Sequence, residues 1–152
     1  MRGRLIAIGD IHGYAASLAA LIEAIDPQPI DTLVPLGDYI DRGLNSRDVL
    51  ERLIALQDRC QLVPILGNHD EVMLEVRAGA EEALDEWLSF GGVSTLASYG
   101  CDHPRGLPAE HIRFLEGCRS WWETSHHFFV HASYLPDLPL AFAHTTADPC
   151  GR

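Results

Sequence analysis

Paired cysteines, basic residues and long apolar runs are all scarce in this sequence of 152 residues. Its cysteines are widely spaced and form no Cys-x-x-Cys pair; they are Cys60, Cys101, Cys118 and Cys150. This spacing excludes a structural zinc site built from thiolates, and it does not give the disulfide framework of a small secreted domain. We therefore expect reduced thiols in a cytosolic protein.

The shortage of basic residues limits the possible partners. Lysine and arginine together number 11 against 22 acidic residues, so the formal net charge is -11 at pH 7. Sequence-independent binding to a nucleic acid or to an anionic membrane needs a basic surface, so neither is expected as a partner. An anionic substrate would have to be attracted locally, because salt screens the bulk charge beyond about 10 Å.

Long apolar segments are also missing near the start of the chain. The run Leu5–Ile8 is far too short for the apolar region of a signal peptide or for a membrane helix, so a cytoplasmic location is expected. The chain does contain enough apolar residues, 47% of the total, to fill the core of one domain.

Three short sequence motifs share one pattern: an apolar run, then glycine, then polar residues of the kinds that bind metals. They are Leu5–Gly13 (LIAIGDIHG), Leu33–Gly43 (LVPLGDYIDRG) and Leu62–Asp70 (LVPILGNHD). Each run is short enough for a buried strand, and glycine allows a sharp turn where the strand ends. Ligands bind at that edge of an open α/β sheet, so we expect the three loops to converge on one site.

The polar residues of these loops indicate a metal centre. Carboxylate, imidazole and amide groups, which suit manganese, iron or zinc, come from Asp10, His12, Asp38 and Asn68. Because two of the loops carry more than one candidate ligand, two adjacent ions are expected. Ions about 3.5 to 4 Å apart can stabilise both the attacking and the leaving oxygen of a phosphoryl displacement. Arg42 fits this chemistry, because a guanidinium group can bind two phosphate oxygens at once.

The segments between the three motifs have helical periodicity. Apolar residues recur at helical spacing in 18–25 and in 46–56, where Ser46 is expected to cap the helix, and the next strand is expected at 62–66. These helices would link the strands into parallel βαβ units. Farther along we expect two helices separated near Gly79 with the second ending at Gly91 and Gly92, a helix near 108–116 and a strand at 127–130.

These residues resemble the motifs of the calcineurin-like metallophosphoesterases, and more narrowly those of the phosphoprotein phosphatase branch with its bacterial members. That branch carries Gly-Asp-x-His-Gly, Gly-Asp-x-x-Asp-Arg-Gly and Gly-Asn-His-Glu, followed by an apolar strand that ends in histidine. The first two motifs match in full at Gly9–Gly13 and Gly37–Gly43, the third differs only at Asp70, and Phe128–Ala132 supplies the later strand. The segment Trp87–Gly100 also resembles the bacterial branch.

The resemblance implies a fold and a set of metal ligands. The fold would be α/β, a calcineurin-like metallophosphatase β-sandwich flanked by helices. Two divalent ions would be bound, with manganese expected and iron or zinc as alternatives. Five residues would hold them, with the carboxylate of Asp38 shared between both ions: Asp10, His12, Asp38, Asn68 and His131.

The resemblance also implies roles in handling the phosphate and the proton. A hydroxide between the metals would be the nucleophile, so no covalent phosphoenzyme is implied. His69 would protonate the leaving oxygen, and Asp41 would hold the tautomer and charge of His69. Arg42 would bind the phosphate, which Asn68 would also contact.

The resemblance fades after about residue 140. The family has a further metal-binding histidine in a Gly-His-Thr phrase, several tens of residues after the position of His131, and a phosphate-binding arginine near it. His144 and Thr145 echo that phrase but lie too close to His131 and lack the glycine. We therefore expect a partial metallophosphoesterase domain at 1–140, truncated after the fourth motif, and a divergent tail at 141–152. Such a chain would hold its second metal weakly.

Several other residues are expected to have structural roles. Asp70 is expected to cap the helix that follows the third motif. Packing or surface positions are expected for the tryptophans and for the histidines outside the motifs: Trp87, Trp121, Trp122, His103, His111, His126 and His127.

The resemblance implies that the chain is a metal-dependent phosphoester hydrolase. The main interpretation is that it is a serine/threonine phosphoprotein phosphatase. A symmetrical dinucleoside tetraphosphatase is the second interpretation, because the same centre attacks phosphorus whatever the leaving group. A catalytically silent metal-binding fragment is the third, motivated by the absent distal histidine and arginine. The expected partner is a phosphoprotein, or a small phosphoester or nucleotide, and the oligomeric state is open.

Overall fold

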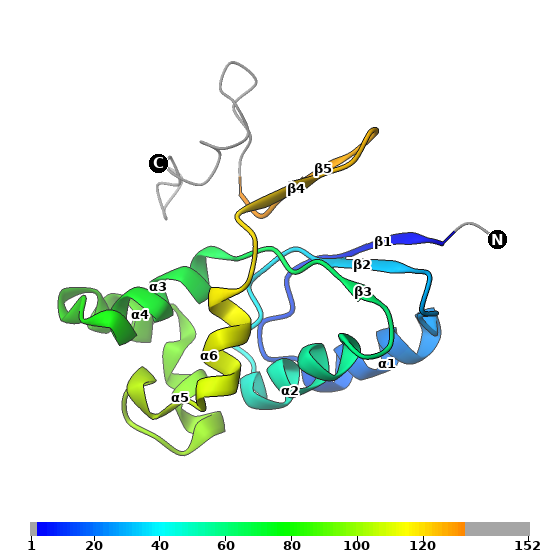
Figure 1. Ribbon diagram of the computed structural model, residues 1–152. Helices are drawn as coiled ribbons and strands as arrows, with labels where there is room; N and C mark the ends of the chain where they lie inside the picture. Colours follow the sequence, from blue (N-terminus) through cyan, green and yellow to red (C-terminus); the bar gives the residue numbers. More distant parts are fainter. Residues whose placement is uncertain (1–2, 133–152) are drawn as a thin grey trace.

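A parallel β-sheet lies at the centre of the molecule. The computed structural model describes residues 3–132. Figure 1 shows the three strands of the sheet, β1 (Leu5–Ile8), β2 (Thr32–Pro35) and β3 (Gln61–Leu62), side by side in that order. Both neighbouring pairs are parallel, with Thr32 opposite Leu5 on one side and Gln61 on the other. The three strands therefore end at the same edge of the sheet, as the sequence predicted.

Two helices cover one face of this sheet. Helix α1 (Ala15–Ile25) follows the first motif and α2 (Ser46–Leu56) follows the second, and Figure 1 shows both on the same side of the strands. Their apolar faces, which include the buried residues Leu18 and Leu50, join Leu33 of β2 in the main core. Full burial of one such leucine is worth about 1.5–3 kcal/mol. Packing of the helices thus holds the strand ends in place.

The opposite face of the sheet carries a smaller apolar cluster. Successive residues of a strand point to opposite faces, so Val34 leaves the main core and packs instead with Val63 and Ile65. Partly buried Trp122 and Phe129, whose rings stack with centroids 5.5 Å apart, lie against this cluster. The second face is therefore covered by residues from much later in the chain.

These two rings belong to an antiparallel hairpin of β4 (Trp121–Glu123) and β5 (Phe128–Val130). Figure 1 shows the hairpin extending away from the helical layer. The strand predicted at 127–130 is confirmed as β5, whereas β4 was not predicted. Within residues 3–132 the sheets are this hairpin and the three-stranded parallel sheet.

Strand β3 is shorter than the predicted strand 62–66. Regular pairing ends at Leu62, because Pro35, the next residue of β2 that faces β3, has no N–H to donate to the ladder. Single hydrogen bonds continue the alignment beyond it, with the backbone N–H of Ile65 donating to the carbonyl of Pro35 at 2.9 Å. The backbone thus stays in register up to the third motif.

The prediction that Ser46 caps α2 is wrong. Asn45 occupies the N-cap position, and Ser46 is the first residue within the helix. The hydroxyl of Ser46 is buried and lies 3.1 Å from the hydroxyl of Thr95. This contact fixes the start of α2 against a segment about fifty positions later in the chain.

A run of helices follows the third motif. Helix α3 (Asn68–Ala78) ends at Gly79, whose φ of 125° is accessible mainly to glycine. The predicted second helix ends as expected at Gly91, whose φ of 121° is not helical, and a further helix begins directly after this kink. The elements after α3 are η1 (Glu81–Ala83), α4 (Leu84–Trp87), η2 (Leu88–Gly92), α5 (Val93–Tyr99), η3 (Pro104–Gly106) and α6 (Ala109–Glu116).

The α/β class and the calcineurin-like fold predicted from the sequence are confirmed. The predicted boundary at residue 140, the tail 141–152 and His144 lie outside the described residues. Within residues 3–132, no helix is both long and apolar enough to span a membrane.

Candidate metal centre

The loops at the carboxyl ends of the three strands meet at one pocket of about 520 Å³. Six of the eight residues predicted from the motifs line it: Asp10, Asp38, Arg42, Asn68, His69 and His131. The other two, His12 and Asp41, are buried behind its wall, with 7% and 0% of their surface exposed. The structure therefore brings the predicted site residues together.

The first two loops place these side chains through left-handed backbone turns. His12, Asp38, Asp41 and Arg42 have φ values of 44°, 51°, 69° and 65°. A left-handed conformation costs a residue with a side chain roughly 1–2 kcal/mol, and strain of this kind is concentrated at functional sites. Gly67 allows the closest approach between loops, since a Cβ there would lie 2.1 Å from the backbone nitrogen of Asp38.

His12 presents a ring nitrogen that has no hydrogen-bond partner in the described part of the chain. Its Nδ1 lies 3.0 Å from the carbonyl oxygen of Ile40, which can only accept, so Nδ1 carries the proton. The buried Nε2 is left without a partner and faces Asp38 Oδ2 at 3.4 Å and Asp10 Oδ2 at 3.9 Å. Metal-binding histidines commonly donate their second N–H to a carbonyl in this way.

His131 has the same arrangement on the other side of Asp38. Its Nδ1 donates to the carbonyl oxygen of Leu36 at 2.6 Å, so Nε2 of the neutral ring carries a lone pair. That nitrogen lies 3.0 Å from Asn68 Oδ1 and 3.3 Å from Asp38 Oδ1. With the ring neutral, no proton lies between these three lone-pair atoms, and a cation placed among them would remove their repulsion. The donor set therefore fits a metal ion.

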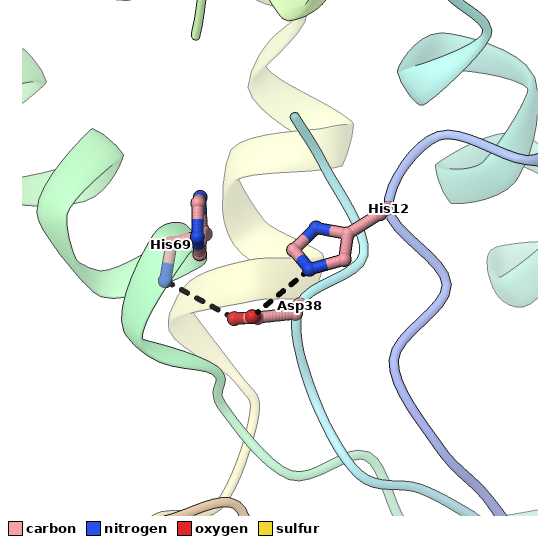
Figure 2. A group of neighbouring side chains, drawn as sticks. All are labelled: His12, Asp38 and His69. Atoms are coloured by element: carbon pink, nitrogen blue, oxygen red, sulfur yellow. Dashed lines mark hydrogen bonds and ion pairs between the residues drawn. The ribbon is translucent and has the colours of Figure 1, made fainter. Parts of the chain in front are cut away.

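Asp38 lies between these two groups of ligands. Its Oδ2 faces His12 and its Oδ1 faces His131, so one carboxylate serves both groups. Figure 2 shows the side chain of Asp38 between the ring of His12 and the backbone of His69, whose N–H donates to Oδ1 at 3.1 Å. A carboxylate placed in this way could be shared between two metal ions, one on the side of each histidine.

His69 also lies close enough to His12 and Asp38 to be counted as a metal ligand. Both of its ring nitrogens are occupied, however. Nδ1 lies 2.8 Å from Asp41 Oδ2, and Nε2 lies 3.1 Å from Arg42 Nη2. Asp41 holds the proton on Nδ1, and Nε2 accepts from Arg42, so Nε2 is the nitrogen that could exchange a proton with a group in the pocket.

Asp41 has two further partners that the sequence did not predict. The indole Nε1–H of Trp87 donates to Oδ2 at 3.0 Å, and the hydroxyl of Thr95 donates to Oδ1 at 2.7 Å. The predicted packing role of Trp87 is confirmed, since 1% of its surface is exposed. The N–H of a buried tryptophan is usually hydrogen-bonded. The sequence therefore indicated that Trp87 would have an acceptor, but not that the acceptor would be Asp41.

Asp70 has the structural role predicted for it. Its carboxylate is fully buried and accepts hydrogen bonds from the backbone N–H of Gly67 and of Tyr39, each at 3.1 Å. The first bond caps α3, and the second ties the third motif to the loop that carries Asp38. Burial, with a smaller contribution from the charge of Asp38, raises the pKa of Asp70 well above its usual value.

We expect the Asp70→Ala variant to lose several degrees of thermal stability. Removing the carboxylate leaves buried N–H groups of both loops unpaired, and each unpaired group costs about 1–3 kcal/mol. Thermal unfolding followed by circular dichroism measures the loss. Glu71→Ala, at an exposed position of the same helix, serves as the control and should unfold near the original temperature. An Asp70→Ala variant as stable as this control would contradict the role.

Comparison with known proteins agrees with the motifs. The sequence profile of calcineurin-like phosphoesterases matches residues 3–145. A symmetrical bis(5'-nucleosyl)-tetraphosphatase of Janthinobacterium sp. (strain Marseille) is 30% identical over 141 residues, which are 89% of this chain and 45% of that protein. Serine/threonine-protein phosphatase 1 of Salmonella typhimurium is 38% identical over 87 residues, 56% of this chain and 37% of that protein.

A solved structure described as a putative diadenosine tetraphosphatase is also similar. Its TM-score is 0.69 at 26% identity, and the match covers 93% of this chain and 55% of that one. The chain spans less than half the length of the two curated relatives. The profile match, the motifs and the fold together show that the chain belongs to the calcineurin-like phosphoesterase family.

Proposed function

We propose that this chain hydrolyses phosphate esters with the help of two divalent metal ions. The observation that carries the proposal is the pair of imidazoles at Asp38. His12 and His131 each donate Nδ1–H to a backbone carbonyl and turn Nε2 toward opposite oxygens of that carboxylate. The arrangement is suited to holding two cations and has no comparable use in packing.

Five residues would hold the ions: Asp10, His12, Asp38, Asn68 and His131. Asp38 would be shared, with His12 on one side of it and Asn68 and His131 on the other, and Asp10 lies near both histidines. Manganese is the expected metal, and iron or zinc would suit the same oxygen and nitrogen ligands. The chemistry that two such ions supply is charge neutralisation on the phosphate and activation of the attacking water.

The other residues of the pocket would bind the phosphate and supply the proton. Arg42 is exposed at the pocket with its guanidinium 3.1 Å from Nε2 of His69. A phosphate bound by Arg42 would therefore place its leaving oxygen beside that nitrogen. Nε2 of His69 accepts from Arg42 here, so a phosphate that draws the guanidinium away would free Nε2 to take up a proton and donate it to this oxygen. Asp41, 2.8 Å from Nδ1, would stabilise the charged ring before the transfer.

The charge of the outer pocket favours a phosphoprotein as the substrate. Glu75 and Glu86 line the pocket, and Arg42 is its sole lysine or arginine among the described residues. A phosphoserine or phosphothreonine side chain brings one phosphate group to the metals, and basic neighbours in a peptide could pair with the two glutamates. A polyphosphate would bring several further negative charges toward the same carboxylates.

A dinucleoside polyphosphate is the second candidate. The Janthinobacterium relative and the similar solved structure both have names that refer to such substrates. In this chain the ring of Phe90 lines the pocket, is 40% exposed and lies 6.4 Å from the ring of His69. An exposed aromatic ring at this position could stack against a nucleobase.

Turnover of two substrates by the purified chain with Mn²⁺ tests the proposal. One is a phosphoserine peptide with arginines beside the phosphoserine, and the other is diadenosine tetraphosphate. We expect the peptide to have a kcat/KM severalfold to about tenfold higher, because each exposed ion pair contributes about 0.2–1 kcal/mol. The Glu75→Gln, Glu86→Gln double variant should reduce that preference.

Each alternative outcome has a clear meaning. Faster hydrolysis of the dinucleotide, with a loss on Phe90→Ala, would support the second candidate. Binding of metal without hydrolysis of either substrate would instead identify a silent metal-binding fragment.

A further inference from the structure

The carboxylate of Asp41 is held by a segment that lies far along the chain. Asp41 has no exposed surface, and its Oδ2 accepts from both His69 Nδ1 at 2.8 Å and Trp87 Nε1 at 3.0 Å. Its Oδ1 accepts from the hydroxyl of Thr95 at 2.7 Å. The three donors come from three different elements, α3, α4 and α5, so the carboxylate cannot rotate without breaking one of these bonds.

The hydroxyl of Thr95 is fully used by this arrangement. It donates its proton to Asp41 Oδ1 and accepts from the backbone N–H of Asp41 at 2.8 Å. Because that proton is already given to the carboxylate, Ser46 must donate across the 3.1 Å between the two hydroxyl oxygens. Thr95 thus fixes both the backbone and the side chain of Asp41, and Ser46 fixes Thr95.

The same segment also holds the backbone of Arg42. The N–H of Arg42 donates to the carbonyl of Gly91 at 3.3 Å, and the hydroxyl of Ser94 donates to the carbonyl of Arg42 at 3.1 Å. A Cβ at Gly91 would lie 2.7 Å from the nitrogen of Arg42, so the approach requires glycine. Asp41 and Arg42 both have the left-handed backbone that these contacts maintain.

Packing alone does not account for these contacts. The ring of Trp87 would fill the core equally well with its N–H turned elsewhere, and valine has nearly the shape of threonine without its hydroxyl. A buried carboxylate is costly unless it is hydrogen-bonded, and His69 alone leaves Oδ1 of Asp41 without a donor. Trp87 and Thr95 therefore bear directly on how Asp41 faces His69.

We propose that Trp87 and Thr95 are positioning residues for proton donation: they fix Asp41 so that it holds the ring of His69 toward the leaving oxygen. The inference rests on the proposed hydrolysis and on the acid role of His69. A residue that acts through His69 affects substrates whose leaving group needs a proton, and it affects much less those whose leaving group departs as a stable anion. General loss of structure affects both substrates alike.

The test compares Thr95→Val, which removes the hydroxyl, with Thr95→Ser, which retains it, and adds Trp87→Phe. Hydrolysis of phosphoserine and of p-nitrophenyl phosphate is measured for each. We expect Thr95→Val and Trp87→Phe to lower kcat on phosphoserine about 10- to 100-fold, as for the loss of one hydrogen bond to a charged group. On p-nitrophenyl phosphate the loss should stay within about threefold, and Thr95→Ser should restore most of the activity.

Leu96→Ala provides the matched control, because Leu96 neighbours Thr95 in α5 and is buried in the core, and its apolar side chain has no group that could hydrogen-bond to Asp41. It should lower thermal stability and leave the ratio of the two activities unchanged. A second readout needs neither metal nor substrate. Of the three tryptophan indole N–H signals in an NMR spectrum, that of Trp87 should be protected from exchange with water and should shift in Asp41→Asn.

The outcomes separate this inference from the function on which it rests. Equal losses on both substrates for Thr95→Val, Thr95→Ser and Trp87→Phe, with a selective loss for His69→Asn, would overturn the positioning role and leave the function standing. Equal losses for His69→Asn itself would remove the acid role and the inference with it. If Trp87→Phe fails to fold, the contrast between the valine and serine variants at position 95 decides.

Discussion

The Asp38→Asn variant is expected to bind both divalent ions more weakly. Asp38 faces His12 with one carboxylate oxygen and His131 with the other. Replacing the carboxylate should therefore weaken binding of both ions. Asparagine keeps an oxygen that can accept the N–H of His69, which limits the damage to the fold. Loss of groups that only support metal ligands typically costs 10- to 100-fold in affinity, and the loss of a shared ligand should cost at least about that much.

Calorimetric titration with Mn²⁺, together with metal analysis of the purified protein, measures the effect. His12→Ala and His131→Ala are the matched controls, because the two imidazoles face different oxygens of Asp38. Each control should weaken one binding event and leave the other nearly intact. Full occupancy of both sites in Asp38→Asn would show that Asp38 is not shared.

The His69→Asn variant is expected to lose about a hundredfold to ten-thousandfold in turnover of phosphoserine. A positioned general acid contributes a factor of this size. The loss should be far smaller with p-nitrophenyl phosphate, whose leaving group departs without a proton. Nε2 of His69 faces the pocket beside Arg42, and its other nitrogen is held by Asp41.

Steady-state kinetics with both substrates at saturating Mn²⁺ checks this expectation. His111→Asn is a suitable control, because His111 is a buried histidine that bonds to the hydroxyl of Tyr99 instead of lining the pocket. It should change the two activities by a similar factor. If His69→Asn also did so, His69 would be contributing something other than a proton.

The candidate site could be predicted from the sequence because its residues are local to three motifs. Each motif joins a strand end to a loop, and parallel strands end at one edge, so Asp10, Asp38 and Asn68 had to lie near one another. His131 was predicted from the family resemblance, since an apolar strand that ends in histidine has no particular meaning by itself.

The supporting contacts could not be predicted, because they join residues that no local pattern relates. Trp87 and Thr95 reach Asp41 across 46 and 54 positions of the chain. Ser46 was predicted to cap a helix because serine often does so, but tertiary contact with Thr95 gives its hydroxyl another use. The length of β3 was also missed, because Pro35 on the neighbouring strand interrupts the hydrogen-bond ladder.

The two histidines that face Asp38 differ in how far along the chain they lie from the carbonyl groups that hold them. His12, Asp38 and their carbonyl partner Ile40 all belong to the first two motifs, whereas His131 must reach back 95 positions to the carbonyl of Leu36. Contacts between distant residues form late, because closing a long loop costs more entropy. During synthesis on the ribosome, the contact between His12 and Ile40 can therefore form while the hairpin that leads to His131 is still emerging. The half of the site around His12 would then form first and offer the surface on which His131 docks.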